Sequence, residues 1–321
     1  MTSPQESTEP VDLTQVHTIP LQTRPNKVAM ARFAQPPKAG RSFAEFLATL
    51  PGILAGQDFR EVVDAIVAAH RNGRPVIVGM GAHVIKCGLN PILIALMERR
   101  IITAVALNGS GAIHDFEIGL IGETSEDVAV GLRDGTFGMV RETGQWFNQA
   151  VNRVLEQRNA GMGSLLAEQL VRILAPHQSQ SLLVAGRRLN IPVTVHAAIG
   201  TDIVHMHPSA DGAALGRATF NDFRLFAGVV AGLRGGVYLN IGSAVILPEV
   251  FLKAFAIAQN LGAQLQDFVT VNMDMIAHYR PGENVVRRPP SIGGRGYTLL
   301  GRHEIMIPFL AQAVVDSVDE V

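Results

Sequence analysis

Five short runs dense in valine and isoleucine alternate along the chain with segments that have a helical spacing of apolar residues. The runs cover residues 75–81, 101–109, 191–200, 235–242 and 267–275. None of them alternates cleanly between apolar and polar residues, which is typical of strands buried on both faces of a parallel sheet. We therefore predict an α/β fold, with a doubly wound, mostly parallel sheet of Rossmann type flanked by helices.

The segments between these runs carry apolar residues every three or four positions. This spacing predicts helices over residues 59–71, 87–100, 162–174, 221–233 and 248–262. Segment 303–318 is mixed, and its first half predicts a final strand while its second half predicts a helix. Residues 1–26 are rich in Pro, Thr, Ser, Gln and Glu, which predicts a flexible tail and leaves residues 27–321 as one α/β domain.

Composition limits the classes of partner and compartment. The net charge of −1 over 321 residues gives no reason to expect nucleic acid or an anionic membrane as a partner. No apolar run reaches the roughly 18–20 residues of a membrane span, and the N-terminus has acidic residues but no basic region of a secretory signal. The one cysteine, Cys87, allows no internal disulfide. We expect a cytoplasmic protein.

Polar residues and glycines follow every predicted strand. Because ligands bind beyond the carboxyl ends of parallel strands, these segments predict one composite pocket for a small-molecule ligand. Seven of the ten histidines lie at these ends or close to them: His83, His114, His196, His205, His207, His278 and His303.

The segment after the third run holds Asp202, His205 and His207 within six residues. Histidines there suit acid–base chemistry or the orientation of a polar substrate. The same three residues could instead ligate a metal ion, or make structural hydrogen bonds. Asp211 is interpreted as a helix or turn cap.

Three further elements have a functional and a structural interpretation. Residues 108–111, Asn-Gly-Ser-Gly, would let backbone N–H groups approach an anion, or would simply form a tight turn. The loop at 279–297 carries Arg280, Arg287, Arg288 and Arg295, which suit phosphate or carboxylate, or form a solvated loop. The chain has only four lysines, and Lys86 alone lies beside the predicted pocket. A mechanism through a Schiff base would therefore have to use Lys86.

The order and spacing of several short motifs resemble the deoxyhypusine synthase family over residues 27–321. In the C-terminal half, LLVAGRRLNIPVTVHAAIGTDIVHMHP, FNDFRLFAGVV and GGVYLNIGSAV follow one another as in that family. The corresponding residues are Asn190 to Val193, Asp202 with His207, Asp222 to Arg224, and Gly242. Earlier, the segment VIVGMGAHVIKCGLNPILIALMERRIITAVALNGSGAIHDFEIGLIG is similar to the family's first turn and second strand.

This resemblance implies a Rossmann-like sheet that binds NAD at the strand ends, and a homotetramer with active sites shared between paired subunits. It also implies dehydrogenation of spermidine and transfer of an aminobutyl group to a protein lysine. Together with the strand-end positions, it places the catalytic candidates at Asp202, His205, His207 and His114. The candidates for cofactor binding are Gly81, His83, Asn108, Gly109, Gly111, Asp115, Asn240, Gly242, Ser243 and Asn272.

Several family positions differ in this sequence. The family's catalytic lysine lies in a region that reads PPSIGGRGYTLLGR here, and no lysine follows Lys253. Arginine cannot replace it, because a guanidinium stays protonated and forms no imine. The family's paired histidines correspond to Ile246 and Leu247, and its acidic pair corresponds to Ile113 and His114, with Asp115 kept.

The sequence therefore predicts a deoxyhypusine synthase-like protein of altered function. It would be an NAD-type enzyme acting on an amine or a related small polar substrate, and not a true deoxyhypusine synthase. Two alternatives remain open. One is a ligand-binding or assembly subunit without catalysis. The other is a metal-dependent hydrolase or lyase that uses Asp202, His205, His207 and His83.

Overall fold

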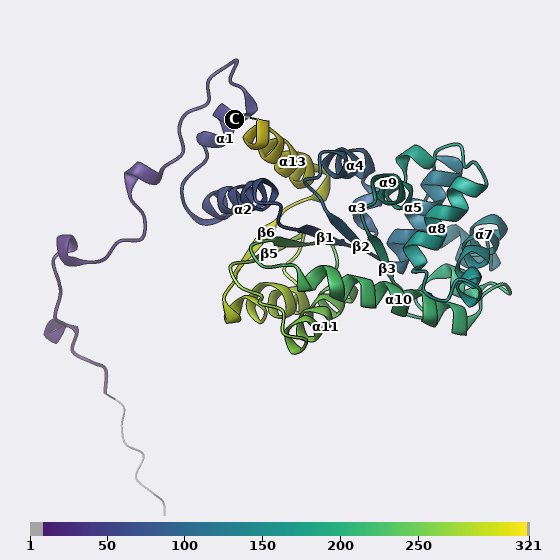
Figure 1. Ribbon diagram of the computed structural model, residues 1–321. Helices are drawn as coiled ribbons and strands as arrows, with labels where there is room; N and C mark the ends of the chain where they lie inside the picture. The colour runs from purple at the N-terminus through teal and green to yellow at the C-terminus, as the bar shows by residue number, and fades with distance from the viewer. Residues whose placement is uncertain (1–8, 320–321) are drawn as a thin grey trace, which may run out of the picture.

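The computed structural model describes residues 9–319, which form a six-stranded sheet with helices on both faces (Figure 1). The strand order is β3-β2-β1-β4-β5-β6, and every neighbouring pair is parallel. This is the doubly wound order in which the chain changes direction between β1 and β4. The predicted fold class is confirmed. The strands are β1 (Val76–Met80), β2 (Ala104–Asn108), β3 (Val193–His196), β4 (Val237–Ile241), β5 (Val269–Asp274) and β6 (Arg295–Leu300).

All five predicted runs contain a strand, because each is buried on both sides of the sheet. In β1, Ile77 packs into the core on one face, whereas Val76, Val78 and Met80 pack into the core on the other. The sixth strand was not predicted. Residues of β6 are mostly half-buried or exposed at the edge of the sheet, so the segment lacks the density of Val and Ile that marks the other strands.

Helices α2, α4 and α13 cover one face of the sheet, and α10 and α11 cover the other (Figure 1). The prediction of a strand in the first half of 303–318 is wrong, because α13 runs unbroken from His303 to Asp319 with Pro308 inside it. The α-helices are α1 (Phe43–Ala48), α2 (Leu54–Arg71), α3 (His83–Lys86), α4 (Asn90–Glu98), α5 (Gly109–Ile121), α6 (Val128–Asp134), α7 (Arg141–Asn152), α8 (Met162–Arg172), α9 (Leu182–Leu189), α10 (Gly212–Ala231), α11 (Ile246–Asn260), α12 (Tyr279–Pro281) and α13 (His303–Asp319).

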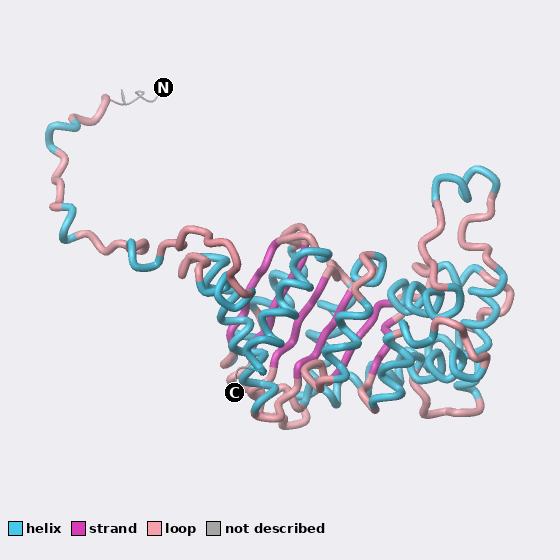
Figure 2. The backbone as a smooth tube through the Cα atoms, turned by 90° about the horizontal axis from the view of Figure 1, so that it is seen from above, coloured by secondary structure: helices cyan, strands magenta, loops and turns pink. Residues whose placement is uncertain are grey.

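The N-terminal part of the described chain is an extended arm that leads away from the sheet (Figure 2). Every residue from 9 to 40 is exposed, and only three short 3-10 turns interrupt the arm. Packing against the α/β core begins with α1, where Phe43 contacts Phe309 of α13 edge to face. Within residues 9–319, no helix has both the length and the apolar character needed to cross a membrane.

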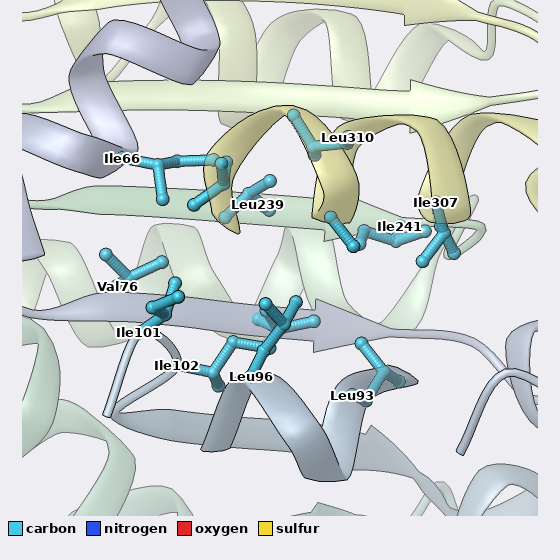
Figure 3. Close-up of a pocket in the computed structure, with 13 residues that line it drawn as sticks. Ile66, Val76, Leu93, Leu96, Ile101, Ile102, Leu239, Ile241, Ile307 and Leu310 are labelled. Carbon is cyan, nitrogen blue, oxygen red and sulfur yellow. The ribbon is translucent and has the colours of Figure 1, made fainter. Parts of the chain in front are cut away.

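A small apolar cavity of about 40 Å³ lies between the sheet and helices α2, α4 and α13 (Figure 3). Its lining is entirely hydrophobic and includes Val76, Leu93, Leu239 and Ile307. Such a cavity offers no hydrogen-bond partner to water or to a polar ligand, so it does not suit polar chemistry.

Candidate active site

A polar cavity of about 240 Å³ lies beyond the carboxyl ends of β2 and β3. Helices α3 and α5, the segment between α5 and α7, and the loop after β3 form its walls. Turns that follow parallel strands meet at this edge of the sheet, as the strand-end pattern predicts. The lining residues are Lys86, Ser110, Ile113, His114, Glu117, Ser125, Glu126, Val128, Phe137, Val140, Thr201, Asp202 and Ile203.

Asp202 is buried at the point where the loop after β3 meets the N-terminus of α5. One carboxylate oxygen accepts a hydrogen bond of 2.9 Å from Ser110 Oγ, whereas Oδ2 is buried without a partner. Burial raises the pKa of Asp202, against the opposing effects of the Ser110 hydrogen bond and the nearby His205. An unpartnered buried carboxylate oxygen is costly for the fold, and a ligand with a hydroxyl or ammonium group would relieve that cost.

A chain of hydrogen bonds joins His114 to Glu117 through Thr124. The Thr124 hydroxyl donates to Glu117 Oε2 at 2.5 Å, and it lies 2.6 Å from His114 Nδ1. Because the single hydroxyl proton goes to the carboxylate, Nδ1 of His114 must donate to Thr124 Oγ1. The lone pair of a neutral His114 is therefore on Nε2.

His114 is held in its neutral form, with the lone pair of Nε2 free. Burial, assisted by the charge of Lys86, lowers the pKa of His114 to about 4, so the imidazole is neutral near pH 7. Glu117 also accepts a hydrogen bond of 3.0 Å from Thr143 Oγ1 on α7, which fixes the other end of the chain. This second support orients the base, as catalytic sites require.

Acidic side chains outnumber basic ones in the lining of the cavity. Three carboxylates line it, on Glu117, Glu126 and Asp202, against the single ammonium of Lys86. None of these three carboxylates is paired with Lys or Arg within residues 9–319. The cavity therefore favours a ligand with a cationic group, and Lys86 favours an anionic group on the same ligand or on a cofactor.

His205 and His207 do not line this cavity. His205 Nδ1 accepts the backbone N–H groups of Gly200 and Asp202 at 3.1 and 3.3 Å, so it stabilises the short helix Ile203–Met206. His207 Nε2 donates to the Gly138 carbonyl at 2.8 Å. The His207 ring lies so close to Gly144 of α7 that a Cβ there would overlap it. Both histidines are held in structural contacts.

The Asn-Gly-Ser-Gly element forms the junction of β2 and α5. Asn108 caps the helix by accepting the Gly111 N–H at 2.9 Å. Gly109 faces Asp202 so closely that a Cβ would collide with the carboxylate. The anion at this helix N-terminus is thus the protein's own Asp202, and Gly109 provides the space for it.

Asp115 was predicted to contact a cofactor, but the fold commits it elsewhere. It is 0% exposed and accepts hydrogen bonds from Asn90 Nδ2, Ser181 Oγ and the backbone N–H groups of Leu182 and Leu183. These bonds join α5 to α4 and to the N-terminus of α9. Burial raises the pKa of Asp115 to about 6, although the four donors favour the carboxylate. We assign Asp115 to helix packing and not to the cofactor.

Gly81 and Gly242 meet at the change of direction between β1 and β4. The Gly81 N–H bonds to Ile241 O at 2.9 Å, and a Cβ on Gly81 would overlap Gly242 O. Gly242 has a φ of 62° and packs against the ring of His303, which is 0% exposed. Contacts within the protein therefore fill the space between the carboxyl ends of β1 and β4, where the chain changes direction.

Below this junction, the amide of Asn240 bonds to Ser243 O at 2.9 Å and to Asn272 Oδ1 at 2.8 Å. Its own Oδ1 and both ring nitrogens of His303 are buried without partners. His83 lies at the surface, with its ring centroid 5.8 Å from that of His303. The cofactor candidates Gly81, His83, Asn240, Gly242, Ser243 and Asn272 thus form a second polar group that shares no residue with the cavity lining.

The metal and phosphate interpretations find no support in the described geometry. Across residues 9–319, no three or more His, Cys, Asp or Glu side chains are placed to hold a metal ion. In the loop at 279–297, Arg287 and Arg288 pair with Glu283, and Arg280 pairs with Glu249.

Sequence reasoning missed Glu117, Thr124 and Ser110. Glu117 lies one helical turn after His114, a spacing that brings the two side chains together on α5. That spacing was a usable signal. Thr124 lies beyond the end of α5, and nothing in the sequence indicates that its loop folds back toward His114.

No protein-family model matches the chain, and no curated protein matches it in sequence. Solved structures do match in fold. The ternary complex of AgrE with ornithine and NAD+ superposes with a TM-score of 0.53 at 16% identity, covering 83% of this chain and 34% of AgrE. A complex of an AgrE variant with L-arginine gives 0.51 at 15% identity, covering 83% and 33%.

A protein assigned as a deoxyhypusine synthase from Entamoeba histolytica gives a TM-score of 0.50 at 11% identity, covering 87% of this chain and 95% of that one. The chain spans about a third of the length of the AgrE structures. At these low sequence identities, the superpositions show a common architecture and do not show a common function. The chain therefore shares an α/β fold with about a third of AgrE and with the Entamoeba histolytica protein.

Proposed function

We propose that the chain is an NAD-type dinucleotide-dependent enzyme that acts on an amine or a related small polar substrate, and that it is not a true deoxyhypusine synthase. The observation that carries the proposal is the convergence of three groups on one cavity at the carboxyl edge of the sheet. They are Asp202 with its unpartnered Oδ2, the neutral His114 supported by Thr124 and Glu117, and Lys86. AgrE, about a third of which superposes on this chain, forms a ternary complex with ornithine and NAD+, which adds support for ligands of this kind.

The cavity of about 240 Å³ is smaller than the roughly 300–1,000 Å³ typical of small-molecule sites, so its residues would contact only part of a dinucleotide. The carboxylate of Asp202, which lines the cavity, suits a ribose hydroxyl, the group that acidic residues bind in many dinucleotide sites. The Lys86 ammonium suits a phosphate oxygen. The N-terminus of α5 is already occupied by Asp202, so we assign the phosphate contact to Lys86 and not to the helix end.

The chain's own residues account for binding and proton movement. The carboxylates of Glu117, Glu126 and Asp202 attract and orient an ammonium group. His114 Nε2 takes the proton that the substrate nitrogen or oxygen releases, and Thr124 and Glu117 stabilise the imidazolium that results. A bound NAD would supply the hydride acceptor.

A calorimetric titration with NAD+ tests this proposal first. We expect wild-type protein to bind in the micromolar range, and Asp202→Asn to weaken binding by about tenfold, the equivalent of one charge-assisted hydrogen bond. Asp211→Asn is the matched control, because Asp211 caps α10 outside the cavity and Asn caps equally well. Absence of NAD+ binding, or equal weakening by both variants, would exclude Asp202 as a cofactor residue.

A ligand-binding subunit without catalysis is the second candidate. The closed contact of Gly81 with Gly242 and the absence of any lysine after Lys253 favour it. It predicts calorimetric binding of an amine to the cavity without formation of NADH. Reduction of NAD+ by any amine in the presence of the protein, lost in His114→Gln, would exclude this candidate. The homotetramer stays a prediction for either function.

A further inference from the structure

A second groove, of about 590 Å³, lies along α10 and shares no lining residue with the candidate active site. One wall is α10, with Gly212, Gly216, Arg217, Phe220 and Arg224. The other wall is the turn that follows the 3-10 helix Arg153–Leu155. The volume is within the range of roughly 300–1,000 Å³ that is typical of small-molecule sites.

The two walls are held together by Asn221 of α10. Its amide donates to the backbone carbonyls of Arg158 and Ala160, both at 2.9 Å. The backbone of Arg158 is therefore held beside the helix, and Arg217 and Arg224 lie two turns apart on the same wall. The groove is preformed, since its shape depends on these backbone contacts and not on a ligand.

Three guanidinium groups lie in this groove without a carboxylate partner. Within residues 9–319, Arg158, Arg217 and Arg224 take part in no ion pair, and their side chains make no hydrogen bond. No acidic residue lines the groove. This local concentration of positive charge contrasts with the chain's net charge of −1.

The acidic residues on α10 and at its N-terminus are committed elsewhere. Asp222 points to the opposite side of α10, where it is 1% exposed and accepts the N–H groups of Gly163 and Val195 at 2.9 and 2.7 Å. Asp211 caps α10 by accepting from Ala213 and Ala214. The arginines are thus left free to bind an external anion.

We propose that this groove is a binding site for a small ligand with two or more phosphate groups. Guanidinium groups bind phosphate oxygens through paired hydrogen bonds and keep their charge at every physiological pH. Phe220 is 58% exposed between the two helical arginines, and its ring offers a face on which a nucleotide base would stack. Gly212 and Gly216 leave open space over the helix backbone, which lets a ligand approach closely.

Calorimetric titrations with inorganic pyrophosphate and with ATP test the proposal. We expect pyrophosphate to bind, with an affinity that falls as salt is added. Arg217→Glu and Arg224→Glu should each weaken binding by about tenfold or more, as expected for the loss of a charge-assisted contact. Arg99→Glu makes the same change of charge at a surface ion pair with Asp319, outside the groove, and should leave binding almost unchanged.

Two further variants separate the possible results. Asp202→Asn should leave pyrophosphate binding intact, which distinguishes this groove from the candidate active site. If ATP binds more tightly than pyrophosphate and Phe220→Ala removes the difference, the ligand is a nucleotide. If the two bind equally, the site recognises phosphate groups alone. The proposal fails if neither probe binds at millimolar concentration, if Arg99→Glu has the same effect as the groove variants, or if only nucleic acid or a protein partner binds.

Discussion

The carboxylate of Asp202 lies against Gly109, at the N-terminus of α5, in the space that any other residue's Cβ would occupy. Ser110 donates to one oxygen of this carboxylate, and the other oxygen is buried without a partner. A helix N-terminus favours negative charge, which supports the carboxylate there although burial raises the pKa of Asp202. Gly109 therefore positions the residue on which the candidate site depends.

Gly109→Ala tests this relationship. The added methyl group would displace the Asp202 carboxylate, and we expect the free energy of unfolding to fall by about 1–3 kcal/mol, the usual cost of overpacking. Ligand binding in the cavity should weaken in the same variant. Chemical denaturation and calorimetry with NAD+ measure the two effects.

Gly228→Ala is the matched control for that substitution. Gly228 lies inside α10 with nothing within 4 Å of an added Cβ. Alanine there should stabilise the protein by about 0.5–1 kcal/mol, because it restricts the unfolded chain and favours the helix. Equal effects of the two substitutions would contradict the close contact between Gly109 and Asp202.

Asp115→Ala should be among the most destabilising single changes in the core. It would leave four buried donors, on Asn90, Ser181, Leu182 and Leu183, without their acceptor. We expect a loss of about 3 kcal/mol or more, since each unsatisfied buried group costs about 1–3 kcal/mol. Thermal and denaturant unfolding measure it.

Asp127→Ala removes a carboxylate from an exposed N-cap, where Asp127 accepts one hydrogen bond from Val130 N. Its expected cost is about 1 kcal/mol. A loss at Asp115 no larger than this would show that the α4–α5–α9 junction does not depend on the buried carboxylate, and would reopen Asp115 as a cofactor residue.

The parallel sheet could be predicted because both faces of β1 to β5 are buried, and burial requires the dense apolar runs. β6 could not, since Arg295, Thr298 and Leu300 are exposed at the sheet edge and give no such signal. The segment of α13 was divided wrongly because its apolar first half, HEIMIPF, covers a face of the sheet as a helix and does not add a strand to the sheet.

The position of the site was predictable, but the orientation of its side chains was not. Because Asp202 and His114 each follow the end of a parallel strand, they lie at the same edge of the sheet for any conformation of the loops. The orientation of His207 depends on Gly138 and Gly144, which lie more than sixty positions earlier in the chain and fold against it only in the tertiary structure. The pairing of Thr124 with His114 likewise depends on a loop conformation that no local pattern encodes.

The stability of the protein should depend on pH through His114. Its pKa is about 4 in the folded protein and about 6.5 when unfolded, because burial and Lys86 disfavour the charged imidazole. Between these values the unfolded chain binds more protons, so stability is lost as the pH falls from 6.5 towards 4. His196, with a pKa lowered to about 3 by burial, acts in the same direction.

His114→Gln should make the decrease in melting temperature between pH 6.5 and 4 shallower, because the contribution of His114 is removed while those of the other buried histidines and carboxylates stay the same. Glutamine keeps a donor for Thr124 Oγ1 but cannot accept the substrate's proton, so turnover should be lost at every pH. An unchanged slope would mean that His114 is as easily protonated in the folded protein as in the unfolded chain. That result would contradict the lowered pKa of His114, whereas turnover that persists in His114→Gln would remove it as the proposed base.

The apolar cavity between the sheet and helices α2, α4 and α13 makes Val76→Ile a stabilising substitution. Filling the void of about 40 Å³ should recover up to about 1 kcal/mol, at roughly 24 cal/mol per Å³ of cavity. Val237 is the control, because it pairs with Val76 in register on β4, is 1% exposed and does not line the cavity. Val237→Ile should destabilise the protein by about 1–3 kcal/mol, since there is no space for the extra methylene group. Denaturant unfolding of both variants measures the difference, and a loss of stability in both would mean that the walls of the cavity already collapse onto one another in solution.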